Sequence, residues 1–186
     1  MVTRKIHERM RPMTPNQQSA FSLIETLIIL IISSILLSIA MPSLSSSIQR
    51  TQQMTHTNQM IGALNYAREK AITSKRMVSL CAGNTSCDNT TRWEQQIIIF
   101  INTNQDGEFN QTDILLNTLY LDKTYSWYWS NFRNQKQMSY KPDGTTHSLN
   151  GTFTLCQHHL PTRVIVLNTS GRARIAAPSN ANACAT

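Results

Sequence analysis

Arg172 and Arg174 are the residues whose type and spacing point most directly to a chemical role. They stand two apart in the segment SGRARIA, which we expect to form a strand, so both side chains point to one face. Gly171, directly before them, suits a turn into that strand. Guanidinium groups bind phosphate through paired hydrogen bonds. The pattern therefore suits phosphate binding, and the alternative is an exposed edge strand protected by its charges.

Further basic residues are candidates for the same surface. One lies on the segment RVIVL, which we expect to pair with the arginine strand, and three precede it in the chain: Arg163, and Lys141, Lys136 and Arg133. The formal net charge of the 186-residue chain is +7. Four basic residues and one acidic residue stand in positions 1–20, so the other positions carry only +4. An excess of this size usually means a solvated surface, and charge alone does not establish anion binding.

The aromatic residues of the segment YSWYW are a second candidate for nucleic-acid contact, because aromatic rings stack on bases: Tyr125, Trp127, Tyr128 and Trp129. We favour a strand with part of these side chains in the core. His147, His158 and His159 raise the question of a metal site. Adjacent histidines on a strand point to opposite faces, so we interpret them as surface residues.

The segment NTNQDGEFNQTD, residues 102–113, partly fits a calcium-binding EF-hand loop. It has Asn102 in place of the first aspartate and Asp113 in place of the final glutamate, and strand-like segments flank it. We therefore predict a hairpin connection. No motif of the GxSxG type surrounds a serine, so we expect no enzyme, no metal and no cofactor.

One acidic residue interrupts the single long apolar segment. Residues 21–41 provide the roughly 20 residues that a membrane-spanning helix needs, and Glu25 is the fifth of them. A carboxylate in the bilayer centre costs about 2.5–3.5 kcal/mol, so Glu25 points to a function and to a cationic partner. Basic residues precede the segment, which predicts a cytoplasmic N-terminus. The small residue Ala20 precedes the segment, whereas a signal peptide is cleaved after it.

The elements that must position these residues follow from the periodicity. We expect one helix from about Phe21 to Lys75, with a flexible joint in the segment SLSSS after Pro42. From Met77 onward, short β-rich segments alternate with turn residues: MVSLC, QIIIFI, ILLNTLYL, YSWYW, TFTLC, RVIVL and RARIA. The predicted fold class is therefore α+β, with the helix packed on an antiparallel sheet. The predicted parts are a leader (1–20), a transmembrane helix (21–42), an amphipathic half-helix (43–76) and a β-rich head (77–186).

Four cysteines follow the membrane segment, which indicates disulfides in an oxidising compartment. Their spacing favours two local pairs, Cys81–Cys87 and Cys156–Cys184, among the three possible pairings. Zinc is disfavoured because the nearest two cysteines are six apart.

The segment SAFSLIETLIIL resembles the class III leader of type IV pilins and type II secretion pseudopilins. The resemblance implies that a prepilin peptidase cuts between Ala20 and Phe21 and methylates the new terminus. Glu25 becomes the fifth mature residue, and its implied partner is the Phe21 amine of a neighbouring pilin in the filament. The family usually has glycine where this chain has Ala20.

The head resembles the GspH/FimT group of minor pilins, and most of all the FimT type. Three segments carry this resemblance: ALNYAREKAITSKRMVSLC, RWEQQIIIFINTNQDGEF and TRVIVLNTSGRARI. FimT-type pilins are associated with DNA uptake in natural transformation through a GRxR motif, which here is Gly171–Arg174.

The resemblance implies a minor pilin of the inner membrane with a periplasmic head, later incorporated into a surface pilus, whose head binds double-stranded DNA without sequence preference. The first alternative is a structural minor pilin, or a GspH-like secretion pseudopilin, that primes filament assembly without binding DNA. The second alternative is an adhesin for surfaces or other macromolecules.

Overall fold

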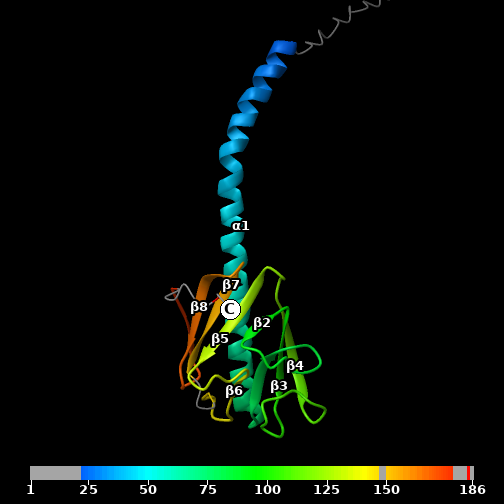
Figure 1. The fold of residues 1–186 in the computed structure, drawn as a ribbon, viewed down its shortest axis with the longest axis vertical. Coiled ribbons are helices and arrows are strands. Elements are labelled where there is room, and N and C mark those ends of the chain that lie inside the picture. Colours follow the sequence, from blue (N-terminus) through cyan, green and yellow to red (C-terminus); the bar gives the residue numbers. More distant parts are fainter. Residues whose placement is uncertain (1–21, 147–149, 178–183, 185–186) are drawn as a thin grey trace, which may run out of the picture. The chain divides into compact units, whose positions relative to one another are not determined.

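The computed structural model describes residues 22–146, 150–177 and Cys184. Within these residues the chain forms one helix, α1 (Leu23–Ser74), followed by nine strands (Figure 1). It divides into two compact units between Ser46 and Ser47. The predicted leader and its cleavage site at Ala20 and Phe21 lie outside the described residues.

The first unit contains the N-terminal part of α1. Its apolar side chains are exposed, and α1 contains the only segment within the described residues that is long and apolar enough to cross a membrane. The hydroxyls of Thr26, Ser34 and Ser38 donate to carbonyls one turn earlier, so these polar groups are satisfied within the helix. Pro42 lies inside α1, and the helix continues through the serine-rich segment after it.

The second unit is built on the C-terminal part of α1. Met60, Leu64, Ala67 and Ala71 are fully buried, and their spacing of three and four residues places them on one face of the helix. This stripe belongs to the same core cluster as the apolar side chains of both sheets.

Two antiparallel sheets complete the second unit. The first has the strand order β4-β3-β1-β6, and the second has the order β2-β5-β7-β8-β9. The strands of the first sheet are β1 (Val78–Ala82), β3 (Gln96–Ile101), β4 (Ile114–Tyr120) and β6 (Met138–Tyr140). Those of the second are β2 (Arg92–Glu94), β5 (Tyr125–Asn131), β7 (Gly151–Gln157), β8 (Leu160–Leu167) and β9 (Ala173–Ala176).

Both predicted disulfides are present. Cys81–Cys87 has a Cα–Cα distance of 5.7 Å, and Cys156–Cys184 has one of 5.8 Å. The second bridge closes a loop that contains β8 and β9. It therefore anchors the chain on the C-terminal side of the arginine segment.

Candidate nucleic-acid interface

The arginine segment lies at the edge of the second sheet, because β9 is the last strand in its order and, among the described strands, pairs with β8 alone. A tight turn precedes it. The Asn168 carbonyl accepts a hydrogen bond from the Gly171 amide at 3.0 Å, and the Asn168 side-chain oxygen accepts one from the Arg172 amide at 2.9 Å. Gly171 has φ +79°, which glycine adopts without strain. The turn thus fixes the backbone of Arg172 directly before the strand begins.

The register of β9 places Arg174 on the outer face of the sheet. Ile175 pairs with the fully buried Ile165, so that pair marks the face toward the core. Arg174 pairs with Val166 and points to the opposite face, as Arg172 does by alternation. Both arginines are exposed, and neither has a carboxylate partner among the described residues. Two uncompensated guanidiniums therefore stand close together on one exposed edge.

Arg68 of α1 binds the turn between β8 and β9. Its Nε donates to the Gly144 carbonyl at 2.8 Å, and its Nη2 donates to the Ser170 carbonyl at 3.3 Å. Tyr140 adds a hydrogen bond from its hydroxyl to the Gly171 carbonyl at 3.4 Å. Burial raises the pKa of Tyr140 well above its ordinary value, so the phenol stays a neutral donor. One cation of the helix thus links two turns that are distant in sequence.

The turn at residues 141–146 is attached to the β8–β9 turn, and this brings Lys141 toward the arginines. The Thr146 amide donates to the Thr169 carbonyl at 3.1 Å, and the Lys141 amide donates to the Thr145 carbonyl at 2.8 Å. Asp143 lies in the same turn. Hydrogen bonds from the Thr145 side chain and amide lower the pKa of Asp143, so this region also carries one firmly ionised carboxylate.

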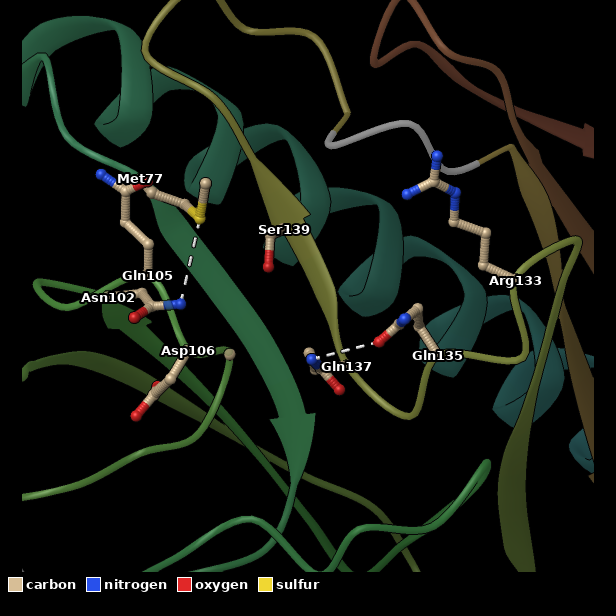
Figure 2. Close-up of a pocket in the computed structure, with 9 residues that line it drawn as sticks. Met77, Asn102, Gln105, Asp106, Arg133, Gln135, Gln137 and Ser139 are labelled. Carbon is tan, nitrogen blue, oxygen red and sulfur yellow. Dashed lines mark hydrogen bonds between the residues drawn. The ribbon is translucent and has the colours of Figure 1, made fainter.

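Arg133 lies at the same end of the second sheet as the arginine segment. The cross-strand pairs Asn131–Gly151, Gly151–Leu167 and Leu167–Ala173 form one row across the sheet. Arg133 follows the first residue of this row by two positions, and Arg172 precedes the last. Three strand spacings of about 4.8 Å separate the ends of the row. Arg133 also lines a pocket of about 220 Å³ together with Asp106, and Figure 2 shows its guanidinium pointing away from the Asp106 carboxylate.

Two predicted members of the surface have other positions. Lys136 lies in the same connection as Arg133, is half-buried, and accepts a hydrogen bond at its carbonyl from the Trp93 indole. Arg163 pairs with the fully buried Leu155, which places it on the core side of the sheet. It lines a small cavity together with Ile175 and Met54 of α1. The structure therefore does not bring Arg163 to the face of Arg174, because an odd number of strand positions separates Arg163 from Val166.

Comparison with known families identifies the scaffold that carries this edge. The family described as Type II transport protein GspH matches residues 56–171, more than half of the chain. The chain belongs to the GspH family. A second match, to the prokaryotic N-terminal methylation motif, covers residues 15–41. A search of curated proteins gave no match.

Solved structures show the same fold as this GspH-family chain. Two crystal forms of the type IV minor pilin FimU from Pseudomonas aeruginosa PAO1 are similar, each 19% identical in sequence. The P21 form has a TM-score of 0.55 and covers 72% of this chain and 97% of its own. The P65 form has a TM-score of 0.54 and covers 69% and 98%. The likeness confirms the predicted α+β pilin fold.

The GspH-family assignment confirms the predicted GspH/FimT group of minor pilins. It describes structural pilins rather than enzymes, and the apolar helix with the methylation motif indicates a membrane-anchored pilin that enters pili. Such a leader implies other pilins and a prepilin peptidase as partners. The family match ends at Gly171, directly before Arg172, so it says nothing about the arginines themselves.

The remaining candidates of this GspH-family chain have structural explanations. Tyr125, Trp127 and Trp129 are buried, and Trp129 stacks on Phe153 with ring centroids 4.2 Å apart. They are therefore core residues, as the favoured interpretation predicted, and Tyr128 is half-buried.

The loop between β3 and β4 is a hairpin connection whose carboxylates bind groups of the loop itself. Asp113 accepts hydrogen bonds from the Thr103 and Asn110 amides, and Asp106 accepts them from the Asn104 and Asn110 side chains. Within the described residues no group of three potential metal ligands occurs.

His158 and His159 are the two central residues of the β7–β8 turn, with φ of +47° and +67°. They are exposed, but they do not lie on a strand as the sequence argument assumed. Positive φ at both central positions is typical of a two-residue type I′ hairpin turn. His147 lies outside the described residues.

Arg68 was not singled out from the sequence as a functional residue, since its helical spacing predicted only packing. Arg68→Met is expected to lower the free energy of unfolding by about 2 kcal/mol, because charged hydrogen bonds to carbonyls contribute about 1.5–3 kcal/mol. Arg68→Lys should recover part of this loss, because a single ammonium keeps the charge but not the two-carbonyl geometry. Urea unfolding measures both values. A midpoint for Arg68→Met equal to that of the wild type would show that the link between the turns is dispensable.

Proposed function

We propose that this chain is a minor type IV pilin whose head binds double-stranded DNA non-specifically for DNA uptake in natural transformation. One observation carries the proposal: Arg172 and Arg174 present two guanidiniums, without carboxylate partners among the described residues, on one face of a sheet edge. Such a pair suits phosphate oxygens, and contacts to phosphate carry no sequence information. Gly171 serves the turn that places them.

The proposed footprint includes Arg172 and Arg174 first, then Lys141 and Arg133. Lys141 is favoured by the hydrogen bonds between its turn and the β8–β9 turn. Arg133 is favoured by its position at the same sheet end. Lys136 contributes less because it is half-buried, and Arg163 is left out because it lies on the core side.

The N-terminal region supports the membrane part of the proposal. We infer that residues 1–20 are a cytoplasmic leader removed between Ala20 and Phe21, that residues 21–42 span the inner membrane, and that residues 43–76 continue the helix to the head at 77–186. The head would then face the periplasm before the pilin enters a surface pilus. The methylation motif at residues 15–41 and the apolar part of α1 favour this arrangement.

The full-length protein in a nonionic detergent, titrated with fluorescent duplex DNA, tests the DNA proposal. We expect a dissociation constant of about 10⁻⁴–10⁻⁶ M at physiological salt, equal for unrelated sequences and weaker as salt rises, because phosphate contacts dominate non-specific binding. No binding at low salt would favour the alternative function, a structural minor pilin or secretion pseudopilin. That alternative is favoured by the match to a type II transport protein family, and by the edge position of β9, where charge prevents strand pairing.

Glu25→Ala is expected to give a protein that is inserted and cleaved normally but is incorporated poorly into filaments. Glu25 lies in the first turn of α1, where the helix dipole favours a carboxylate and where a neighbouring Phe21 amine would pair with it. Quantitative blotting of sheared pili against membrane fractions measures incorporation. Glu25→Asp is the matched variant that keeps the charge. Equal incorporation of Glu25→Ala and wild type would remove this explanation of the charge within the apolar segment.

A further inference from the structure

A second basic surface lies next to the Lys141 turn. A groove of about 330 Å³ is lined by three cations, Lys75, Arg76 and Lys141, and every other residue that lines it is uncharged. Lys75 and Arg76 directly follow the end of α1. Neither was singled out from the sequence. The groove thus joins the end of the helix to the turn that carries Lys141.

The local backbone and one hydrogen bond define the shape of this groove. Lys75 has φ +56°, so the chain reverses direction there as α1 ends. The Arg76 Nη2 donates to the Thr103 hydroxyl at 2.8 Å, which leaves the other guanidinium donors free of protein partners within the described residues. Arg76 is therefore held in position while keeping its capacity to bind an anion.

The nearby carboxylates form no ion pair with these cations among the described residues, although the charge of Lys141 contributes to the lowered pKa of Asp143. Asp113 accepts the Thr103 and Asn110 amides, and Asp106 accepts side-chain amides of its own loop. Asp143 accepts from Thr145. Within the described residues, none of the three forms an ion pair with a cation of the groove.

The groove is connected to the arginine edge through hydrogen-bonded turns. Lys141 lines the groove, and its turn contains Gly144, whose carbonyl oxygen lies against Gly171 directly before Arg172. The Thr146 amide bonds to Thr169 of the β8–β9 turn. The connected turns therefore carry Arg172, Lys141, Arg76 and Lys75 in succession, with the exposed Asp143 carboxylate in the same turn as Lys141.

We propose that Lys75 and Arg76 extend the DNA footprint, so that the phosphate backbone bound at the β9 edge continues across the Lys141 turn into this groove. This inference rests on the proposed DNA-binding function. The groove suits a polyanion, because two lysine ammonium groups and one arginine guanidinium line it and each can bind phosphate oxygens. No aromatic side chain on which a base could stack is among its lining residues.

The test compares Lys75→Gln/Arg76→Gln with the wild type as full-length protein in nonionic detergent, with one 20-base-pair duplex over a range of salt concentrations. If both residues neutralise a phosphate, the slope of log affinity against log salt should flatten by about 1.8, at ~0.9 per contact. The matched control is Arg50→Gln/Lys123→Gln, which removes the same charge. Lys123 lies two positions before Tyr125, the first residue of β5, and Gln52, two positions after Arg50, accepts a hydrogen bond from Tyr125. The control therefore lies at the other end of the sheet.

The outcomes separate this inference from the function beneath it. A flatter slope for the groove variant than for the control supports the extended footprint. If the wild type binds and Arg172→Ala/Arg174→Ala weakens binding, but the groove variant matches the control, the groove inference is overturned and the proposed function stands. If the wild type does not bind DNA, both are overturned. Unfolding midpoints of the variants, expected to lie close to that of the wild type, show that glutamine at the exposed Lys75 and the half-buried Arg76 leaves the fold intact.

Discussion

Arg172→Ala/Arg174→Ala is expected to weaken binding to all DNA sequences alike and to flatten the salt slope by about 1.8 units. Each guanidinium that neutralises one phosphate releases about 0.9 counterions from the duplex. At about 0.1 M salt, two lost contacts correspond to a roughly 60-fold loss of affinity by the same relation. Loss of these side chains should leave the fold unchanged, because both are exposed and neither forms an ion pair among the described residues.

Stability should hardly change in this variant, since exposed charges on a strand contribute little to the free energy of unfolding. Arg172→Lys/Arg174→Lys is the matched control: it keeps the charge and loses the fork, so part of the binding and most of the salt slope should remain. In a competent host, transformation should fall while other pilus functions persist. If affinity and salt slope are unchanged in the alanine variant, the arginines do not bind DNA and serve only to prevent strand pairing at the sheet edge.

Cys156→Ser/Cys184→Ser is expected to cost about 3.6 kcal/mol of unfolding free energy in the loop-entropy relation, and Cys81→Ser/Cys87→Ser about 2.2 kcal/mol. The difference follows from sequence separations of 28 and 6 residues. Guanidinium titration monitored by tryptophan fluorescence measures both, because Trp93, Trp127 and Trp129 are fully buried.

Cys156→Ser/Cys184→Ser should also affect DNA binding, because the loop closed by the Cys156–Cys184 disulfide contains β8, the β8–β9 turn and β9. Loss of the bridge leaves the C-terminal segment attached only through an edge strand, so the arginines become less ordered and binding should weaken with the slope retained. The Cys81–Cys87 variant serves as the control, because its bridge lies at the end of β1. Equal unfolding midpoints for the wild type and the Cys156 variant, or peptide mapping that finds another pairing, would contradict this account.

The sequence predicted those elements whose patterns are long or strongly apolar. The helix was expected from Phe21 to Lys75 and is described from Leu23 to Ser74. The segments QIIIFI and YSWYW were expected as strands and form β3 and β5. The strands β2 and β6 have three residues each, too few for an alternation pattern, and were not predicted.

The candidate site was predictable only where local spacing decides it. Arg172 and Arg174 share a face because they are two apart, and no tertiary information is needed for that. To predict the face on which Arg163 lies, the register between β8 and β9 must be known, and the sequence does not reveal it. To predict the role of Arg68, one must know that the turns at Gly144 and Gly171, 27 residues apart, are in contact. Such contacts depend on tertiary packing, so periodicity cannot indicate them.

The close approach of Gly171 to Gly144 shows that the glycine and the arginines of the GRxR motif have different roles. A Cβ at Gly171 would lie 2.2 Å from the Gly144 carbonyl oxygen, a backbone atom that no side-chain exchange can displace. Glycine at this position is therefore demanded by the fold, whatever the head binds. Relatives that do not bind DNA should keep this glycine, whereas the two arginines should be replaced by other residues. In an alignment, conservation of the two arginines would then indicate DNA binding, whereas conservation of the glycine would indicate only that the fold is shared.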